Sequence, residues 1–132
     1  MALILPLAVT AASKAPPNFS RITHTGKVVA GKLIEIGLDL KGIKLEAVTF
    51  SGDEAVVVVW NRTPSSVTGH VGIALYDKKN RMIAAESDSQ SFTRTFTKIR
   101  SGKTANFKIK FGKFMSNFKN AARYRLVFVT RS

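Results

Sequence analysis

The side chains that could do chemistry are few, and they form no organised motif. The chain has two histidines, His24 and His70, and no cysteine, so no thiolate nucleophile, disulfide or cysteine zinc site can form. A zinc site without cysteine needs His or carboxylate ligands at regular spacing, and the sequence shows none. Asp77 and His70 could join a serine as a triad, but no nucleophile elbow accompanies them. We therefore predict a protein that is not an enzyme and holds no metal or cofactor.

These residues also have structural interpretations. We expect both histidines at exposed strand positions, with His24 on an edge strand. Asp77 is expected to build a turn by accepting backbone N–H groups, with Asn80 in the left-handed region of that turn. The acidic pair at 53–54 lacks the dense oxygen ligands of a calcium loop and is expected in a solvated turn.

The strongest chemical signal is the basic, aromatic string FKIKFGKFMSNFKNAARYR at 107–125, which contains no acid. Residues 1–88 hold ten Lys and Arg and all eight acids, a balance of +2, whereas residues 89–132 hold eleven Lys and Arg and no acid. Such a field attracts anions over roughly 8–10 Å at physiological salt. The alternative is a solvated basic face without a partner. The predicted anion- or partner-binding residues are Arg94, Lys98, Arg100, Lys103, Lys108, Lys110, Lys113, Lys119, Arg123 and Arg125.

Strand alternation decides whether the aromatic side chains can join these cations. A strand at 103–111 turns Phe107 and Phe111 to the core and Lys108 and Lys110 to water. A single-strand nucleic-acid binder needs aromatic rings and cations on one exposed surface. Phe107 and Phe111 do not meet that condition. The condition stays open for two other groups of residues. The first is Phe92, Arg94 and Phe96, and the second is Phe114, Phe118 and Lys119.

Strand signals dominate the chain. The run AVVVVW at 55–60 is typical of a strand buried on both faces, with Trp60 as a core anchor. The spacing of Phe111, Phe114, Met115 and Phe118 predicts one short helical turn near 113–121. The expected fold is an all-β, antiparallel immunoglobulin-like β-sandwich of about seven to nine strands. Its strands are expected at 22–30, 32–40, 43–50, 55–60, 67–76, 82–85, 91–99, 103–111 and 124–130.

The first 20 residues differ from the rest. Residues 2–12 are almost wholly apolar, with small residues near 11–15, and residues 14–20 form a Pro-rich linker. The apolar run is too short to cross a membrane as a helix, and no Lys or Arg precedes it. Two interpretations fit: an export signal, or an ordered end that packs as a strand on a neighbouring subunit. We expect one domain at 21–132 and export to the periplasm or outside the cell, with the cytoplasm as the alternative.

The order of features between about 55 and 130 resembles the FxLYD-type immunoglobulin-like domains of bacterial exported proteins. The features are VVVVWN at 56–61, VGIALYD at 71–77, RMIAAES at 81–87, IRSGKTANFKIKF at 99–111 and YRLVFV at 124–129. Ile73 stands where the motif has Phe. The resemblance implies a non-catalytic sandwich on an envelope or secreted protein, and it implies no ligand.

A second resemblance concerns the alternation of Gly69, Val71, Ile73, Leu75 and Asp77. It is similar to a pattern in the jelly-roll movement proteins of plant viruses, which bind single-stranded nucleic acid. Two functions are therefore carried forward. The first is a non-catalytic binding or assembly module whose basic half contacts a protein, an anionic polymer or a neighbouring subunit, with self-association through edge strands or the N-terminal segment. The alternative is a nucleic-acid-binding protein that contacts the backbone electrostatically without reading sequence.

Overall fold

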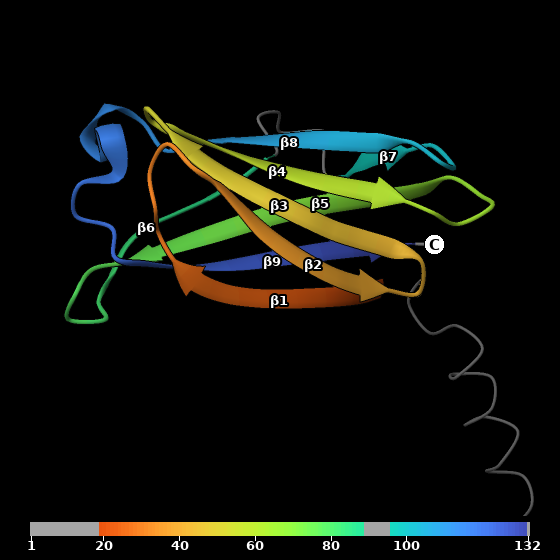
Figure 1. Ribbon diagram of the computed structural model, residues 1–132, viewed down its shortest axis with the longest axis horizontal. Coiled ribbons are helices and arrows are strands. Elements are labelled where there is room, and N and C mark those ends of the chain that lie inside the picture. The colour runs from red at the N-terminus through yellow and green to blue at the C-terminus, as the bar shows by residue number, and fades with distance from the viewer. Residues whose placement is uncertain (1–18, 89–95, 132) are drawn as a thin grey trace, which may run out of the picture.

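Two antiparallel sheets pack face to face as a β-sandwich (Figure 1). The computed structural model describes residues 19–88 and 96–131, and within these ranges it has nine strands and one 3-10 helix. The predicted fold class is therefore confirmed. Residues 1–18 lie outside the described residues, so the leader remains a prediction.

The first sheet, sheet A, has the strand order β1-β9-β5-β6, and β7 pairs with the start of β5. Its strands are β1 (Phe19–Lys27), β5 (Val67–Tyr76), β6 (Met82–Ser87), β7 (Thr97–Ile99) and β9 (Arg123–Arg131). β1 begins two residues before the expected domain boundary, inside the segment that was predicted to be linker. The first and last strands of the described chain are thus neighbours in one sheet.

The second sheet, sheet B, has the order β2-β3-β4-β8. Its strands are β2 (Leu33–Leu40), β3 (Ile43–Ser51), β4 (Glu54–Asn61) and β8 (Thr104–Lys110). The 3-10 helix η1 (Lys113–Phe118) connects β8 in sheet B to β9 in sheet A. This crossover sends the two halves of the basic string into different layers.

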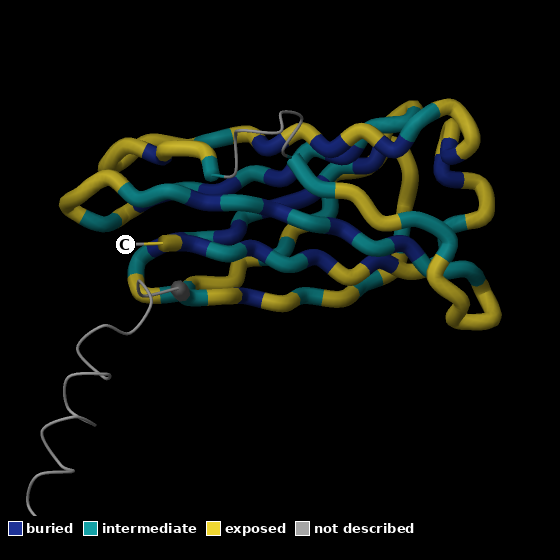
Figure 2. Tube along the Cα trace, turned by 180° about the vertical axis from the view of Figure 1, so that it is seen from behind, coloured by how far each residue is buried: buried dark blue, intermediate teal, exposed yellow. Residues whose placement is uncertain are grey.

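Period-two alternation builds the core between the sheets, because each strand turns every second side chain inward. Figure 2 shows buried and exposed segments alternating along the strands. Phe107, Ile109 and Phe111 are buried, whereas Lys108 and Lys110 are exposed, as the alternation predicted. The phenylalanine rings pack in edge-on pairs, with 6.0 Å between the ring centroids of Phe107 and Phe128. These rings are therefore not free to stack on bases.

The prediction for the valine-rich strand β4 is wrong. Val57 and Val59 are fully buried, but Val56, Val58 and Trp60 are only half-buried and occupy the other face of the strand. A sandwich covers each sheet on one side only, and no described element packs on the outer side of sheet B. Trp60 therefore lies on the outer face rather than in the core.

The helical prediction at 113–121 is also corrected. The helix is a short 3-10 turn, and Ser116 and Asn117 inside it have non-helical backbone angles, with φ of 60° at Asn117. This kink breaks the expected face: Met115 and Phe118 are buried, while Phe114 is 73% exposed. One aromatic ring of the basic string therefore reaches the surface.

Candidate anion-binding surface

The outer face of sheet A gathers cations from both ends of the chain. On β9, Tyr124, Leu126, Phe128 and Thr130 point into the core, so Arg123, Arg125 and Arg131 point outward. Directly paired residues of antiparallel strands share a face. On β1, Lys27 is paired with Arg123 of β9, and Arg21 is paired with Val129 of β9. Both β1 cations therefore lie on the same outer face as the β9 arginines. We call the following six residues the basic face: Arg21, Lys27, Lys98, Arg123, Arg125 and Arg131.

Half of this surface was missed from the sequence. Arg21, Lys27 and Arg131 were not predicted as binding residues, whereas Lys98, Arg123 and Arg125 were. The alternation in RITHTGK at 21–27 already places Arg21 and Lys27 on one face of a strand. What the sequence lacked was the partner strand, because the β1–β9 pairing joins residues about a hundred positions apart.

The centre of this face carries small or β-branched side chains on β1 and β9. In the middle of the sheet, Thr23 on β1 lies opposite Val127 on β9, and Val127 lies opposite Gly72 on β5. Arg125 on β9 lies opposite Ala74 on β5. The cations form two groups, Lys27 with Arg123 and Arg125, and Arg21 with Arg131 and Lys98. Six residues separate the groups along each strand, which corresponds to about 20 Å. An extended anion that follows β1 and β9 can therefore contact both groups, with His70 and Asp88 beside its path on the β5 side.

A hollow opens at the first cation group, beside the β5–β6 turn. Its lining includes Thr25, Tyr76, Asn80, Arg123 and Arg125, together with Tyr124. These side chains offer two guanidinium groups, hydroxyls and an amide, and no carboxylate. The hollow can therefore accept an anionic group through several donors at once. A second hollow on the other side of the turn is lined by Asp77, Lys78, Lys79, Arg81, Ile83, Lys119, Asn120, Ala121 and Ala122.

Asp77 holds the turn between these hollows in place, as predicted. Its Oδ1 accepts backbone N–H bonds from Lys79 and Arg81, each 2.9 Å long, and its Oδ2 accepts from Arg81 Nε at 2.9 Å. The backbone hydrogen bond from Arg81 is the main cause that lowers the pKa of Asp77. Asn80 has φ of 64°, in the left-handed region, as expected. The only acid in either lining is thus engaged in building the turn.

The other predicted cations lie elsewhere. Lys108 and Lys110 face outward on sheet B, where Lys110 on β8 lies opposite Glu54 in the register with β4. The turn between β7 and β8 carries Arg100 and Lys103, and Lys103 N–H donates to Arg100 O. Lys113 at the start of η1 and Lys119 directly after its end line a small hollow together with Phe114. Arg94 and Phe92 lie outside the described residues. The basic half of the sequence is therefore not one stripe on the surface.

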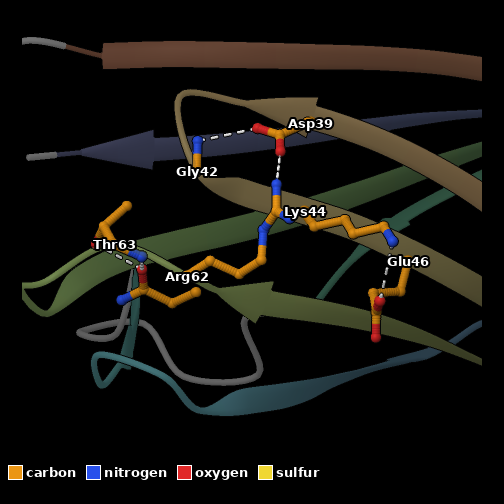
Figure 3. Close-up of polar contacts among 7 residues, drawn as sticks. Asp39, Gly42, Lys44, Glu46, Arg62 and Thr63 are labelled. Carbon is orange, nitrogen blue, oxygen red and sulfur yellow. Dashed lines mark hydrogen bonds and ion pairs between the residues drawn. The ribbon is translucent and has the colours of Figure 1, made fainter.

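The outer face of sheet B balances its charges instead. Lys44 pairs with Glu46 at 3.7 Å, and Arg62 pairs with Asp39 (Figure 3). Arg62 also lies over the Trp60 ring, 5.5 Å from its centroid. Lys44 and Arg62 on this face therefore have local anionic or aromatic partners.

Neither histidine is an exposed strand residue, so that prediction is wrong. His24 is half-buried with Nε2 3.0 Å from the Tyr124 hydroxyl, and burial lowers the pKa of His24. Burial likewise raises the pKa of Tyr124. His70 is half-buried with Nδ1 2.7 Å from Asp88 Oδ1, which also accepts from Val71 N–H. The partner of His70 is therefore Asp88, not the Asp77 considered from the sequence.

Asn61 was a structural residue that the sequence pattern marked only as the end of a strand. It is fully buried, and its Nδ2 donates to the backbone oxygens of Ser65 at 2.9 Å and Ile99 at 3.0 Å. Its Oδ1 accepts from Thr63 N–H at 2.9 Å. Asn61 thus fastens the β4–β5 loop to the end of β7.

Two further properties concern the described part of the chain, residues 19–88 and 96–131. His, Asp and Glu side chains there do not gather in groups of three that could hold a metal ion. No helix in those ranges has the length and apolar character needed to cross a membrane.

No protein-family model matches the chain, and no curated protein matches its sequence. The likeness to FxLYD-type domains therefore rests on the strand and hairpin features quoted above.

Proposed function

We propose that the protein is a non-catalytic β-sandwich binding module whose basic face contacts an anionic polymer. The observation that carries this proposal is the pairing of β1 with β9, two strands that contain five Lys and Arg and no acid. Alternation directs all five cations to the outer face, and Lys98 on β7 adds a sixth.

The six cations of the basic face are available to a partner. Within the described residues, no carboxylate forms an ion pair with any of them, and all six are exposed. Exposed cations without local partners attract an anionic polymer, release its counterions on binding and make its affinity fall with salt.

Charge neutralisation on one face tests this proposal. Changing Arg21, Lys27, Arg123 and Arg125 together to Gln should weaken binding to a polyanion such as heparin at least about tenfold and flatten its salt dependence. The matched control changes Lys32, Lys41, Lys108 and Lys110 to Gln, which removes the same charge from sheet B and its turns. Binding is measured by titration at two salt concentrations. Equal losses in both variants would show that only net charge matters, and would contradict the proposal.

Export is part of the proposal and is supported by the apolar segment at 2–12 and by the FxLYD resemblance. The test is the N-terminus of the protein purified from its native source. We expect a new N-terminus between residues 12 and 16. A chain that retains Met1 and fractionates with the cytoplasm would contradict export without affecting the basic face.

Nucleic acid is the second candidate partner, and one observation favours it. Tyr76 lines the same hollow as Arg123 and Arg125, so an aromatic ring and two cations share one exposed surface. This is the condition that the buried phenylalanines fail. Stacking of a base on an aromatic ring contributes about 1–3 kcal/mol.

The test for this candidate separates stacking from charge. Tyr76→Leu should lower the affinity for single-stranded oligouridylate at least about fivefold, and should leave the affinity for heparin unchanged. Tyr76→Phe is the control, because it keeps the ring and loses only the hydroxyl. Equal effects of Tyr76→Leu on both polymers would argue against a nucleic acid.

A further inference from the structure

We infer that the protein binds a second copy of itself, with Phe114 of one copy seated in a hollow on the outer face of sheet B of the other. This contact uses neither the basic face nor an anionic polymer. The two sides of this contact carry the two most exposed large apolar side chains of the described residues. Phe114 is 73% exposed and Leu33 is 62% exposed. Phe114 lies on the η1 segment at one end of the sandwich (Figure 1), and Leu33 lies on β2.

The η1 segment presents Phe114 on a rigid base. The buried side chains of Met115 and Phe118 anchor the segment, with 5.1 Å between the ring centroids of Phe118 and Phe50. Its backbone is tied to the β3–β4 turn by hydrogen bonds from Phe111 N–H to Asp53 O at 2.8 Å and from Asn117 N–H to Gly52 O at 2.6 Å. A side chain held in this way loses little conformational freedom when it binds.

Two irregularities in sheet B create the hollow. The register of β2 shifts between Glu35 and Leu38, and the register of β3 shifts between Leu45 and Ala47, so the bulges face each other. The hollow is lined by Leu33, Glu35, Ile36, Gly37, Lys44, Glu46, Ala47 and Val58. Gly37 has φ of 70° and open space where a Cβ would be. The opening therefore combines apolar side chains (Leu33, Ile36, Ala47 and Val58) with charged ones, and it lacks a side chain at Gly37 that would fill it.

The charges around the two sides are complementary. The hollow carries the carboxylates of Glu35 and Glu46 against one cation, Lys44, whereas Phe114 lines its own hollow with Lys113 and Lys119 and no acid. Carboxylates at the hollow repel an anionic polymer and favour an apolar group flanked by cations. The η1 segment of a second copy is such a group.

The contact joins two copies rather than two parts of one chain. Within one chain, Phe114 lines the hollow at η1 and does not line the hollow at β2 and β3. Its ring instead lies over Gly112, where an added Cβ would come within 3.4 Å of Phe114 Cε1. The ring is nevertheless 73% exposed, so most of its surface is open to a second copy.

The experiment is sedimentation of the full chain over a concentration series at low salt, without polyanion. The wild-type average mass should rise with concentration. Phe114→Ser should weaken association at least about tenfold, as expected for losing one buried aromatic contact. The control Met82→Ser removes another exposed apolar side chain, on sheet A, and should leave association unchanged.

A complementary variant tests the other side of the contact. Leu33→Ser combined with Glu46→Lys changes the hollow and should also abolish association, with folding checked by circular dichroism. Mixing this variant with Phe114→Ser should restore association, because one intact Phe114 then meets one intact hollow. A wild-type chain that stays monomeric at every concentration overturns the inference. So does equal weakening by Phe114→Ser and Met82→Ser, or a mixture that remains monomeric.

Discussion

The outer faces of the two sheets use the same strand alternation but distribute charge in opposite ways. On sheet A, β1, β9 and β5 contain five Lys and Arg and no acid. On sheet B, β2, β3 and β4 carry four acids, and two of these pair with Lys44 and Arg62. One face is an unbalanced cationic surface, while the other carries both acids and cations, some of them in ion pairs.

This difference shows that the location of a charge matters more than its total. Lys108 and Lys110 belong to the most basic part of the sequence, yet they lie on the sheet whose strands hold four of the eight acids. Arg21 and Lys27 belong to the balanced half, yet they complete the basic face. Four experiments test this contrast between the two faces.

The largest effect is expected from adding acids to the basic face. Thr23→Glu with Thr25→Glu places two carboxylates among its cations, and Thr25 is directly paired with Arg125. Polyanion affinity should fall at least about tenfold, while the free energy of unfolding changes by less than about 1 kcal/mol. The control Thr49→Glu with Thr104→Glu adds the same charge to sheet B. A control loss as large as the test loss would end the distinction between the faces.

The next effect concerns the inner and outer sides of β5. A Cβ at Gly69 would come within 2.6 Å of the buried Phe128 ring, whereas a Cβ at Gly72 meets only the Glu86 carbonyl oxygen at 3.8 Å. Gly69→Ala should therefore lower the free energy of unfolding by about 1–3 kcal/mol. Gly72→Ala should change it by less than about 0.5 kcal/mol. Urea denaturation measures both, and similar losses would mean that the outer face is also tightly packed.

A smaller effect on stability is expected from His24, whose side chain lies on the inner face of sheet A beside Tyr124. Its pKa is lowered by burial, so the unfolded chain binds a proton more readily than the folded chain. The stability that neutral His24 contributes is complete above the ordinary pKa of about 6.5 and is lost as the pH falls below it. Denaturation at several pH values should show this loss in the wild type and not in His24→Gln. Identical pH profiles would refute it.

The smallest effect is expected for the surface ion pairs of sheet B. Glu46→Gln removes the partner of Lys44, and because both side chains are about one-third exposed the loss should be below about 1 kcal/mol. The loss should shrink further at high salt. A large loss that shrinks with salt would show that charge balance stabilises this face, and a loss independent of salt would show that the ion pair is not its cause.

Much of the fold could be predicted because it depends on local patterns. Alternation from 103 to 111 correctly separated Phe107 and Phe111 from Lys108 and Lys110, and the turn at Asp77 and Asn80 followed from residue types with known turn geometry. The failures came where local patterns allow two outcomes. Trp60 fits a buried or a half-buried strand equally well, and the spacing of Phe114 fits a helix that a kink at Asn117 interrupts.

Local patterns in the sequence predicted most of the strands, the two faces of β8 and the fold class, because side-chain period and turn chemistry act over a few residues. Which strands are neighbours, and which faces stay uncovered, depends on the tertiary structure. The pairing of β1 with β9 brings together residues about a hundred positions apart in the sequence. No local sequence pattern predicts which strand will be the neighbour of β1. That pairing assembles the basic face, and the crossover at η1 divides the basic string between the two sheets.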